Sequence, residues 1–249
     1  MRVRDSIGLN LSPFILRLVL AITFVWAGAG KLLPVHQFTP DQAAALANMG
    51  AIEAPASAPV NPAPQAGLPA VTDAAPKYLP EQFPEGVQAR RVLGLALMLD
   101  HAAHPGFTDD GVEPRPIWPP DLAAGKRPVY LAYAVAITEL VGGMALLLGL
   151  FTRLGVLGLV FVMLGAIWLD QIGPAVQSGN ALFGFLPPHG AFDVDAQGKP
   201  VWMPLLWQLS LLGASSAVFF LGAGGLSLDR IVFGGPQKRT VVQTSEKHD

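Results

Sequence analysis

Residues 129–172, VYLAYAVAITELVGGMALLLGLFTRLGVLGLVFVMLGAIWLDQI, carry the clearest structural signal in this chain. It holds two apolar runs, residues 129–150 and 154–172, separated by only a short turn. Each run is close to the roughly 20 residues that a helix needs to cross a bilayer. Because the connection is so short, the two runs predict an antiparallel pair of membrane-spanning helices.

The composition extends this prediction to the whole chain. Of its 249 residues, 51% are hydrophobic and only 14% are charged, whereas soluble domains usually carry about a quarter charged residues. Two further apolar runs, residues 13–33 and 203–226, are also long enough to span a bilayer. The sequence therefore predicts an all-α integral membrane protein: a single membrane domain, residues 1–249, built as a four-transmembrane-helix bundle.

Charge and cysteine content exclude several classes of function. The formal net charge is -2, so the chain lacks the basic field of a nucleic-acid-binding protein. It contains no cysteine, which excludes disulfides, thiolate metal sites and thiol redox chemistry within the chain. Membrane lipid is the expected environment. If a redox reaction takes place here, the electrons must come from a bound cofactor or from another subunit.

The positions of lysine and arginine predict the orientation. Short loops on the cytoplasmic side of membrane proteins carry an excess of these residues. With four spans, all the basic flanks fall on one side: Arg2, Arg4, Arg153, Arg230, Lys238 and Arg239. We therefore expect both termini to be cytoplasmic. The first apolar run is longer than the core of a cleaved signal peptide, so we expect it to be retained as a helix.

The long segment 34–128 is predicted to be an extracytoplasmic insertion between the first two spans. Residues 51–76 are rich in alanine and proline and predict an extended strap. Residues of about 87–103 predict a surface helix, because Val92, Leu95, Leu99 and Ala102 recur at helical spacing. We expect this helix to dock on the bundle or on a partner through its apolar side.

Glu139 is the one acid in the second span, and its neighbours predict which way it points. A charged side chain at membrane depth costs on the order of 3 kcal/mol to insert, so it normally faces protein or a watery cavity. Its face of the helix is otherwise small: Ala132, Ala136 and Gly143. The first span carries a matching stripe: Arg17, Ala21, Phe24, Gly28 and Lys31.

These stripes predict that Glu139 points toward the first span, and they leave its partner open. Glu139 can pair with Arg17, pair with Lys31, or join both through water. Such charges often do no more than lock the register of two helices. If the cluster is functional, Glu139, Arg17 and Lys31 are the candidate catalytic residues.

Other polar residues give weaker indications of a functional site. Asp100, His101 and His104 form a D-H-x-x-H pattern, and two histidines at this spacing can share a metal. No third ligand follows from the spacing, so the polar side of an exposed helix explains them equally. Trp26, Trp168 and Trp202 lie toward the outer ends of three spans, as in an aromatic belt. No nucleotide-binding or haem motif is visible, so no cofactor is expected within the chain.

Three segments together resemble the DoxX/DoxD family of four-helix membrane proteins: LRLVLAITFVWAGAGKLL, ELVGGMALLLGLFTRLG and LGAGGLSLDRIVFG. The resemblance covers the four spans; the long segment 34–128 departs from it. It implies a small bundle in the bacterial or archaeal cytoplasmic (inner) membrane, and its DoxD branch is associated with thiosulfate:quinone oxidoreductase. The matching polar positions are Arg17, Lys31, Glu139, and Asp229 with Arg230.

Two functional hypotheses remain. In the first, the chain is a quinone-linked redox membrane component, with Glu139 carrying protons and a partner supplying electrons. In the second, it is a non-catalytic accessory subunit of a larger membrane complex that binds partners through its outer loop.

Overall fold

The computed structural model describes residues 3–53, 78–106, 111, 114–224 and 227–233. The strap predicted over residues 51–76 lies almost wholly outside these ranges. The described elements, in chain order, are α1 (Val3–Leu32), β1 (Val35–Phe38), α2 (Pro40–Asn48), η1 (Pro80–Gln82), β2 (Val87–Arg90), α3 (Leu93–Ala103), η2 (Pro120–Ala123), α4 (Arg127–Leu148), α5 (Thr152–Ile167), η3 (Trp168–Ile172), α6 (Gly173–Gln177), α7 (Met203–Leu221) and α8 (Leu228–Phe233).

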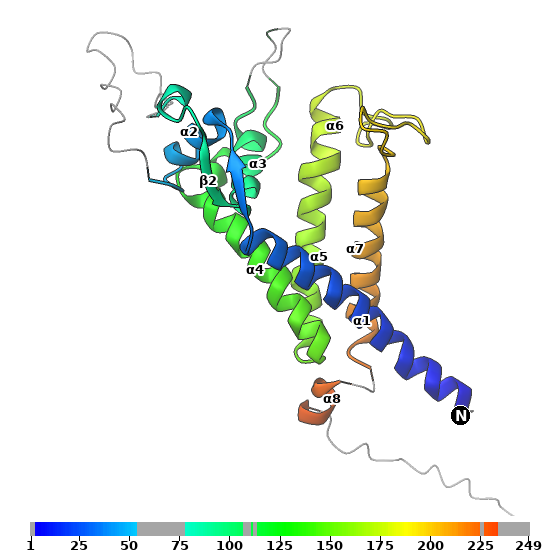
Figure 1. Ribbon diagram of the computed structural model, residues 1–249. Helices are drawn as coiled ribbons and strands as arrows, with labels where there is room; N and C mark the ends of the chain where they lie inside the picture. The colour runs from blue at the N-terminus through cyan, green and yellow to red at the C-terminus, as the bar shows by residue number, and fades with distance from the viewer. Residues whose placement is uncertain (1–2, 54–77, 107–110, 112–113, 225–226, 234–249) are drawn as a thin grey trace, which may run out of the picture.

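Four of these helices are long and apolar enough to cross a membrane, which confirms the predicted four-helix membrane bundle. The spans are Leu11–Leu32, Arg127–Leu148, Thr152–Gln177 and Met203–Leu221. The third continues through η3, a π-helical turn, into α6. Figure 1 shows the spans running between two ends. We call the end with α2, α3 and the strands the loop end, and the end with the N-terminus and α8 the terminal end.

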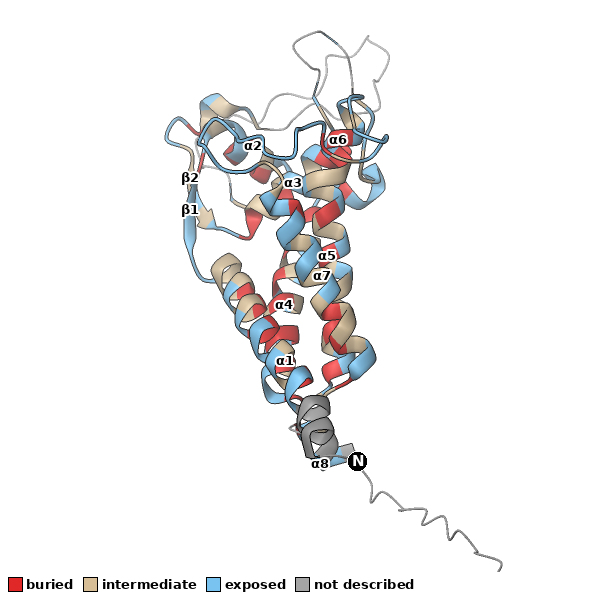
Figure 2. Ribbon diagram, turned by 90° about the vertical axis from the view of Figure 1, so that its right-hand side faces the viewer, coloured by how far each residue is buried: buried red, intermediate tan, exposed pale blue. Residues whose placement is uncertain are grey.

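Glycines set the closest approach between α1 and α4. A Cβ atom on Gly28 would lie 2.7 Å from the backbone nitrogen of Leu140, and one on Gly143 would lie 2.8 Å from that of Val25. Because small residues let helix backbones approach in lipid, the two helices pack together from the Lys31–Glu139 level to the Arg17–Leu146 level. Figure 2 shows buried residues interspersed with intermediate and exposed ones along the spans.

The central core lies toward the terminal end. Here Leu20 and Phe24 of α1 pack with residues of the other three spans: Leu146, Val156, Leu159, Met163 and Val218. Each span buries only a minor share of its residues, 17–33% in its most apolar window. The remaining apolar surface is the area that lipid contacts in a membrane.

The loop between α1 and α4 begins with a small folded unit that we call the cap, made of β1, α2, β2 and α3. The two strands pair antiparallel, with Val35 opposite Arg90 and Phe38 opposite Val87. Thr39 starts α2 with a capping box, in which its side chain and that of Gln42 satisfy each other's backbone amides. The predicted all-α fold does not include this two-stranded sheet.

The prediction of one helix over about 87–103 is therefore wrong at its start. Residues 87–90 form β2, and the helix begins at Leu93. The docking prediction is confirmed in kind, because α3 packs on α4 of the bundle. Val92 is fully buried and Leu99 is buried, whereas Leu95 is only partly buried. Leu93 and Ala96 complete the contact, which includes Ala132 and Ala136 of α4.

Candidate functional site

Glu139 points into the bundle. It lies on the face of α4 that carries Ala132, Ala136 and Gly143, all of them buried. Its own side chain is only 4% exposed. Because the neighbouring positions are small, α1 lies directly against this face and leaves Glu139 no route to lipid.

Lys31, in the last turn of α1, is the ion-pair partner of Glu139. Its Nζ donates a hydrogen bond to Glu139 Oε2. The two groups differ in access, since the Lys31 side chain is 26% exposed. The predicted orientation of Glu139 is confirmed, and Lys31 is the partner among the alternatives that the sequence left open. A buried carboxylate therefore meets an ammonium that also reaches the molecular surface.

The cap holds Lys31 in place. The Val92 amide donates to the Lys31 carbonyl at 2.9 Å, and Arg90 Nη1 donates to the Leu33 carbonyl at 2.7 Å and the Leu32 carbonyl at 3.2 Å. The last carbonyls of a helix otherwise lack partners. The cap thus supplies the missing donors and fixes the end of α1 directly above the ion pair.

Arg17 belongs to a different site. It is 14 residues before Lys31, which is roughly 21 Å along the helix. Its guanidinium is buried, and Nε donates to the Leu146 carbonyl at 3.1 Å. Nη1 donates to the Ala223 carbonyl, after α7. The structure therefore separates Arg17 from the Lys31–Glu139 pair and uses it to join three spans at the terminal end.

Asp229 completes this terminal-end cluster. Its carboxylate accepts hydrogen bonds from the amides of Phe151 at 2.7 Å and Thr152 at 2.9 Å, where α5 begins. Burial alone would raise the pKa of Asp229, but these amide hydrogen bonds and the charge of Arg17 hold it below its ordinary value. The Arg230 side chain lies outside the described part, so its predicted pairing with Asp229 stays a prediction.

The two histidines of the metal hypothesis do not converge with further ligands. His104 Nδ1 lies 3.2 Å from Asp100 Oδ1, one turn away on the same helix, and His101 is exposed. Among the described residues no group of three His, Asp or Glu side chains could hold a metal ion. Within the described part, the pattern fits the polar side of α3.

A second polar site in the spans went unnoticed in the sequence. Asp170, in η3, accepts hydrogen bonds on Oδ2 from Gln171 Nε2 at 2.7 Å and from Gln208 Nε2 of α7 at 3.0 Å. The available signal was an acid and an amide standing alone in apolar runs, at IWLDQI and LLWQLS. Only the structure shows that they meet.

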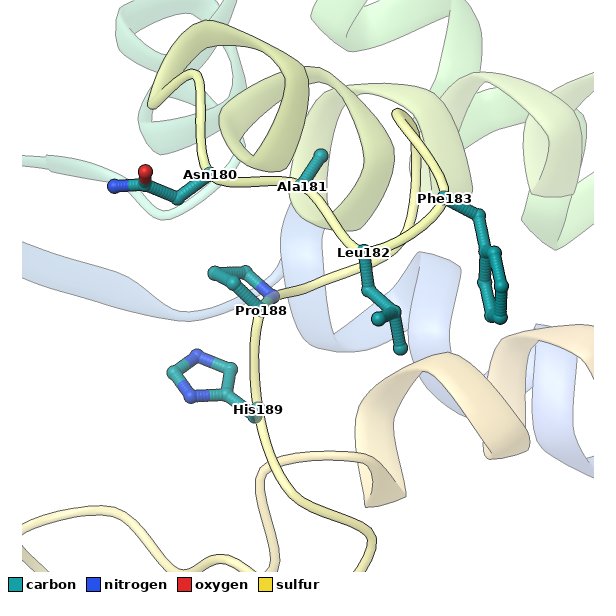
Figure 3. Close-up of a pocket in the computed structure, with 6 residues that line it drawn as sticks. All are labelled: Asn180, Ala181, Leu182, Phe183, Pro188 and His189. Carbon is teal, nitrogen blue, oxygen red and sulfur yellow. The ribbon is translucent and has the colours of Figure 1, made fainter.

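A shallow pocket lies apart from both sites, in the loop that joins α6 to α7. Figure 3 shows Asn180, Ala181, Leu182, Phe183, Pro188 and His189 around it. It is open to solvent and includes neither member of the ion pair. Its position gives no support to chemistry at membrane depth.

Comparison with protein families bears on the identity of the bundle. The DoxX family model matches residues 106–170, a stretch that contains α4, α5 and Glu139. This stretch of the chain is therefore similar to the DoxX family. Searches of curated proteins and of solved structures found no match. The family and the four apolar helices together identify a multi-pass membrane protein.

Proposed function

We propose that this protein belongs to the DoxX family and is a quinone-linked membrane component of a redox assembly, and that the Lys31–Glu139 pair meets the quinone headgroup. The observation that supports the proposal is the unequal access of the pair. Glu139 is enclosed between α1 and α4, whereas Lys31 remains partly exposed beside it. A membrane amphiphile can therefore approach the ammonium without displacing a helix.

The chemistry required of the two residues is limited. Reduction of a quinone consumes two electrons and two protons and gives the quinol. Lys31 can donate a hydrogen bond to a quinone carbonyl, and Glu139 can hold a proton and return it to the site. The electrons come from a partner redox subunit, since the chain has no cysteine. Arg17 has no part in the proposed site, because its donors are engaged at the other end of α1.

The test begins with the protein extracted in a mild detergent together with whatever accompanies it. We expect quinone and a redox subunit to co-purify with the wild type. Glu139→Gln should lower quinone reduction while the assembly stays intact, because it removes the proton-carrying group and keeps the shape. Glu81→Gln is the matched control, since Glu81 is an exposed acid of the outer loop. Equal quinone reduction in wild type and Glu139→Gln would refute the proposal.

One observation favours the accessory hypothesis as a second candidate. The described part of the outer loop contains a folded cap, whose Phe38, Leu46 and Val92 form a core together with Ala132 and Ala136 of α4. A folded unit at this position suits partner binding and needs no chemistry from Glu139. In that case, removing the chain should disrupt the complex, and Glu139→Gln should change only its stability.

A further inference from the structure

The site formed by Asp170, Gln171 and Gln208 has a charge that the described part of the chain does not balance. The amide groups of Gln171 and Gln208 carry no charge, so they do not neutralise the Asp170 carboxylate. Both donate to the same carboxylate oxygen, Oδ2. Among the described residues the ion pairs are Lys31–Glu139 and Asp100–His104, so no cation lies within salt-bridge distance of Asp170. Since both amides of this site donate to Oδ2, the second carboxylate oxygen, Oδ1, remains available as an acceptor within the described part of the chain.

The depth of Asp170 follows from the lengths of the two helices. Asp170 follows Thr152, the first residue of α5, by 18 residues, which is roughly 27 Å along the span. Gln208 lies five residues after Met203, roughly 8 Å inside the loop end of α7. Since the hydrocarbon core is about 30 Å thick, Asp170 lies close to its loop-end boundary. That is the level at which lipid headgroups begin.

Aromatic neighbours mark the same level. Trp168 and Trp207 are partly exposed next to Asp170 and Gln208 in the chain, and Trp168 Nε1 donates to the Ile117 carbonyl at 2.8 Å. Tryptophan is enriched where the headgroups meet the hydrocarbon. Asp170 itself is exposed where η3 meets α7, so a headgroup can reach it.

We propose that Asp170, held by Gln171 and Gln208, binds the primary ammonium headgroup of a phospholipid such as phosphatidylethanolamine. The ammonium supplies both the missing positive charge and the N–H donors for the free carboxylate oxygen. A choline headgroup carries the charge but has no N–H donor, so the site should discriminate between the two lipids. This inference is independent of the quinone proposal and concerns different helices.

The test measures lipids retained by the full chain in bilayer nanodiscs that contain phosphatidylethanolamine and phosphatidylcholine in equal amounts. By native mass spectrometry we expect the wild type to retain the ethanolamine lipid about fivefold over the choline lipid, which corresponds to about one net hydrogen bond. Asp170→Asn should abolish the preference, because it replaces the carboxylate that accepts the ammonium N–H with a neutral amide of the same shape. The matched control Asp121→Asn, an exposed acid at the same end of the molecule, should retain it.

Three outcomes would overturn the proposal. Wild type that retains the two lipids equally would show that N–H donors do not matter. An unchanged preference in Asp170→Asn would place the discriminating site elsewhere. Displacement of the retained lipid by millimolar free ethanolamine would assign the site to small amines rather than to a lipid. Because the first comparison uses only the wild type, it stands even if Asp170→Asn fails to fold.

Discussion

Removing Lys31 should be more damaging than removing the charge of Glu139. Lys31→Met leaves the Glu139 carboxylate enclosed, with a side chain only 4% exposed and no other cation paired with it in the described part of the chain. Breaking a buried pair in this way costs about 3–5 kcal/mol. The exposure of Lys31 lowers this figure, because solvent screens the pair. We therefore expect a loss of about 2–3 kcal/mol in the free energy of unfolding.

Glu139→Gln should cost less, about 1 kcal/mol, since the freed Lys31 ammonium can turn toward water along its flexible stem. The double variant Lys31→Met with Glu139→Gln removes both charges and should lie near the Glu139→Gln single variant. The two substitutions are then non-additive by about 2–3 kcal/mol. Denaturant titration of the protein in bicelles, followed by tryptophan fluorescence, measures all four unfolding free energies.

The ordering of the variants decides the outcome. Additive effects in this cycle would mean that the two side chains do not interact in the membrane. A Lys31→Met variant within about 0.5 kcal/mol of wild type would refute the idea that Glu139 is enclosed. Either result would also remove the structural basis of the proposed quinone site.

Three further predictions follow from other parts of the structure. Gly28→Ala should destabilise the bundle by about 1–3 kcal/mol through overpacking, since the added Cβ would meet the α4 backbone. The matched control Gly30→Ala should not, because its Cβ would have no neighbouring atom within 4 Å. Equal effects of the two substitutions in the same titration would contradict this packing. Folding lowers the pKa of Asp229, so the stability that this carboxylate contributes is complete above its unfolded pKa of about 3.9 and is lost as pH falls through the lower folded value. The difference in unfolding free energy between wild type and Asp229→Asn should therefore shrink over that pH range. A difference that does not change with pH would refute this. A reporter fused after Asp249 should be active on the cytoplasmic side, as the lysine and arginine bias predicts; activity only outside the cell would reverse the topology.

The spans and the direction of Glu139 were predictable because lipid leaves few alternatives. A backbone in hydrocarbon must satisfy its own hydrogen bonds, so a long apolar run becomes a helix. An acid in such a run must turn away from lipid, and the small residues around Glu139 show the side on which another helix can approach. The same reasoning found the matching stripe on α1, because the glycines and cations recur there with helical spacing.

The cap was not predictable to the same degree, because its segments lie outside the hydrocarbon and have no such constraint. Val87 to Arg90 become a strand only because residues 35–38 lie beside them as a partner. Strand pairing between segments far apart in the chain depends on tertiary context more than on local preference. The packing side of α3, by contrast, followed from its own apolar spacing, with Val92 and Leu99 both buried.

Four membrane spans and a Glu139 side chain that faces α1 followed from the pattern of residues along the chain. The packing of the helices was needed to show that Lys31 is the partner of Glu139, that Arg17 lies at the terminal end, and that Asp170 contacts Gln208. Periodicity along one helix reports the direction of a side chain, because every residue turns by a constant angle. It does not report how far a second helix is shifted along its axis, and that shift selects which polar groups come within hydrogen-bond distance.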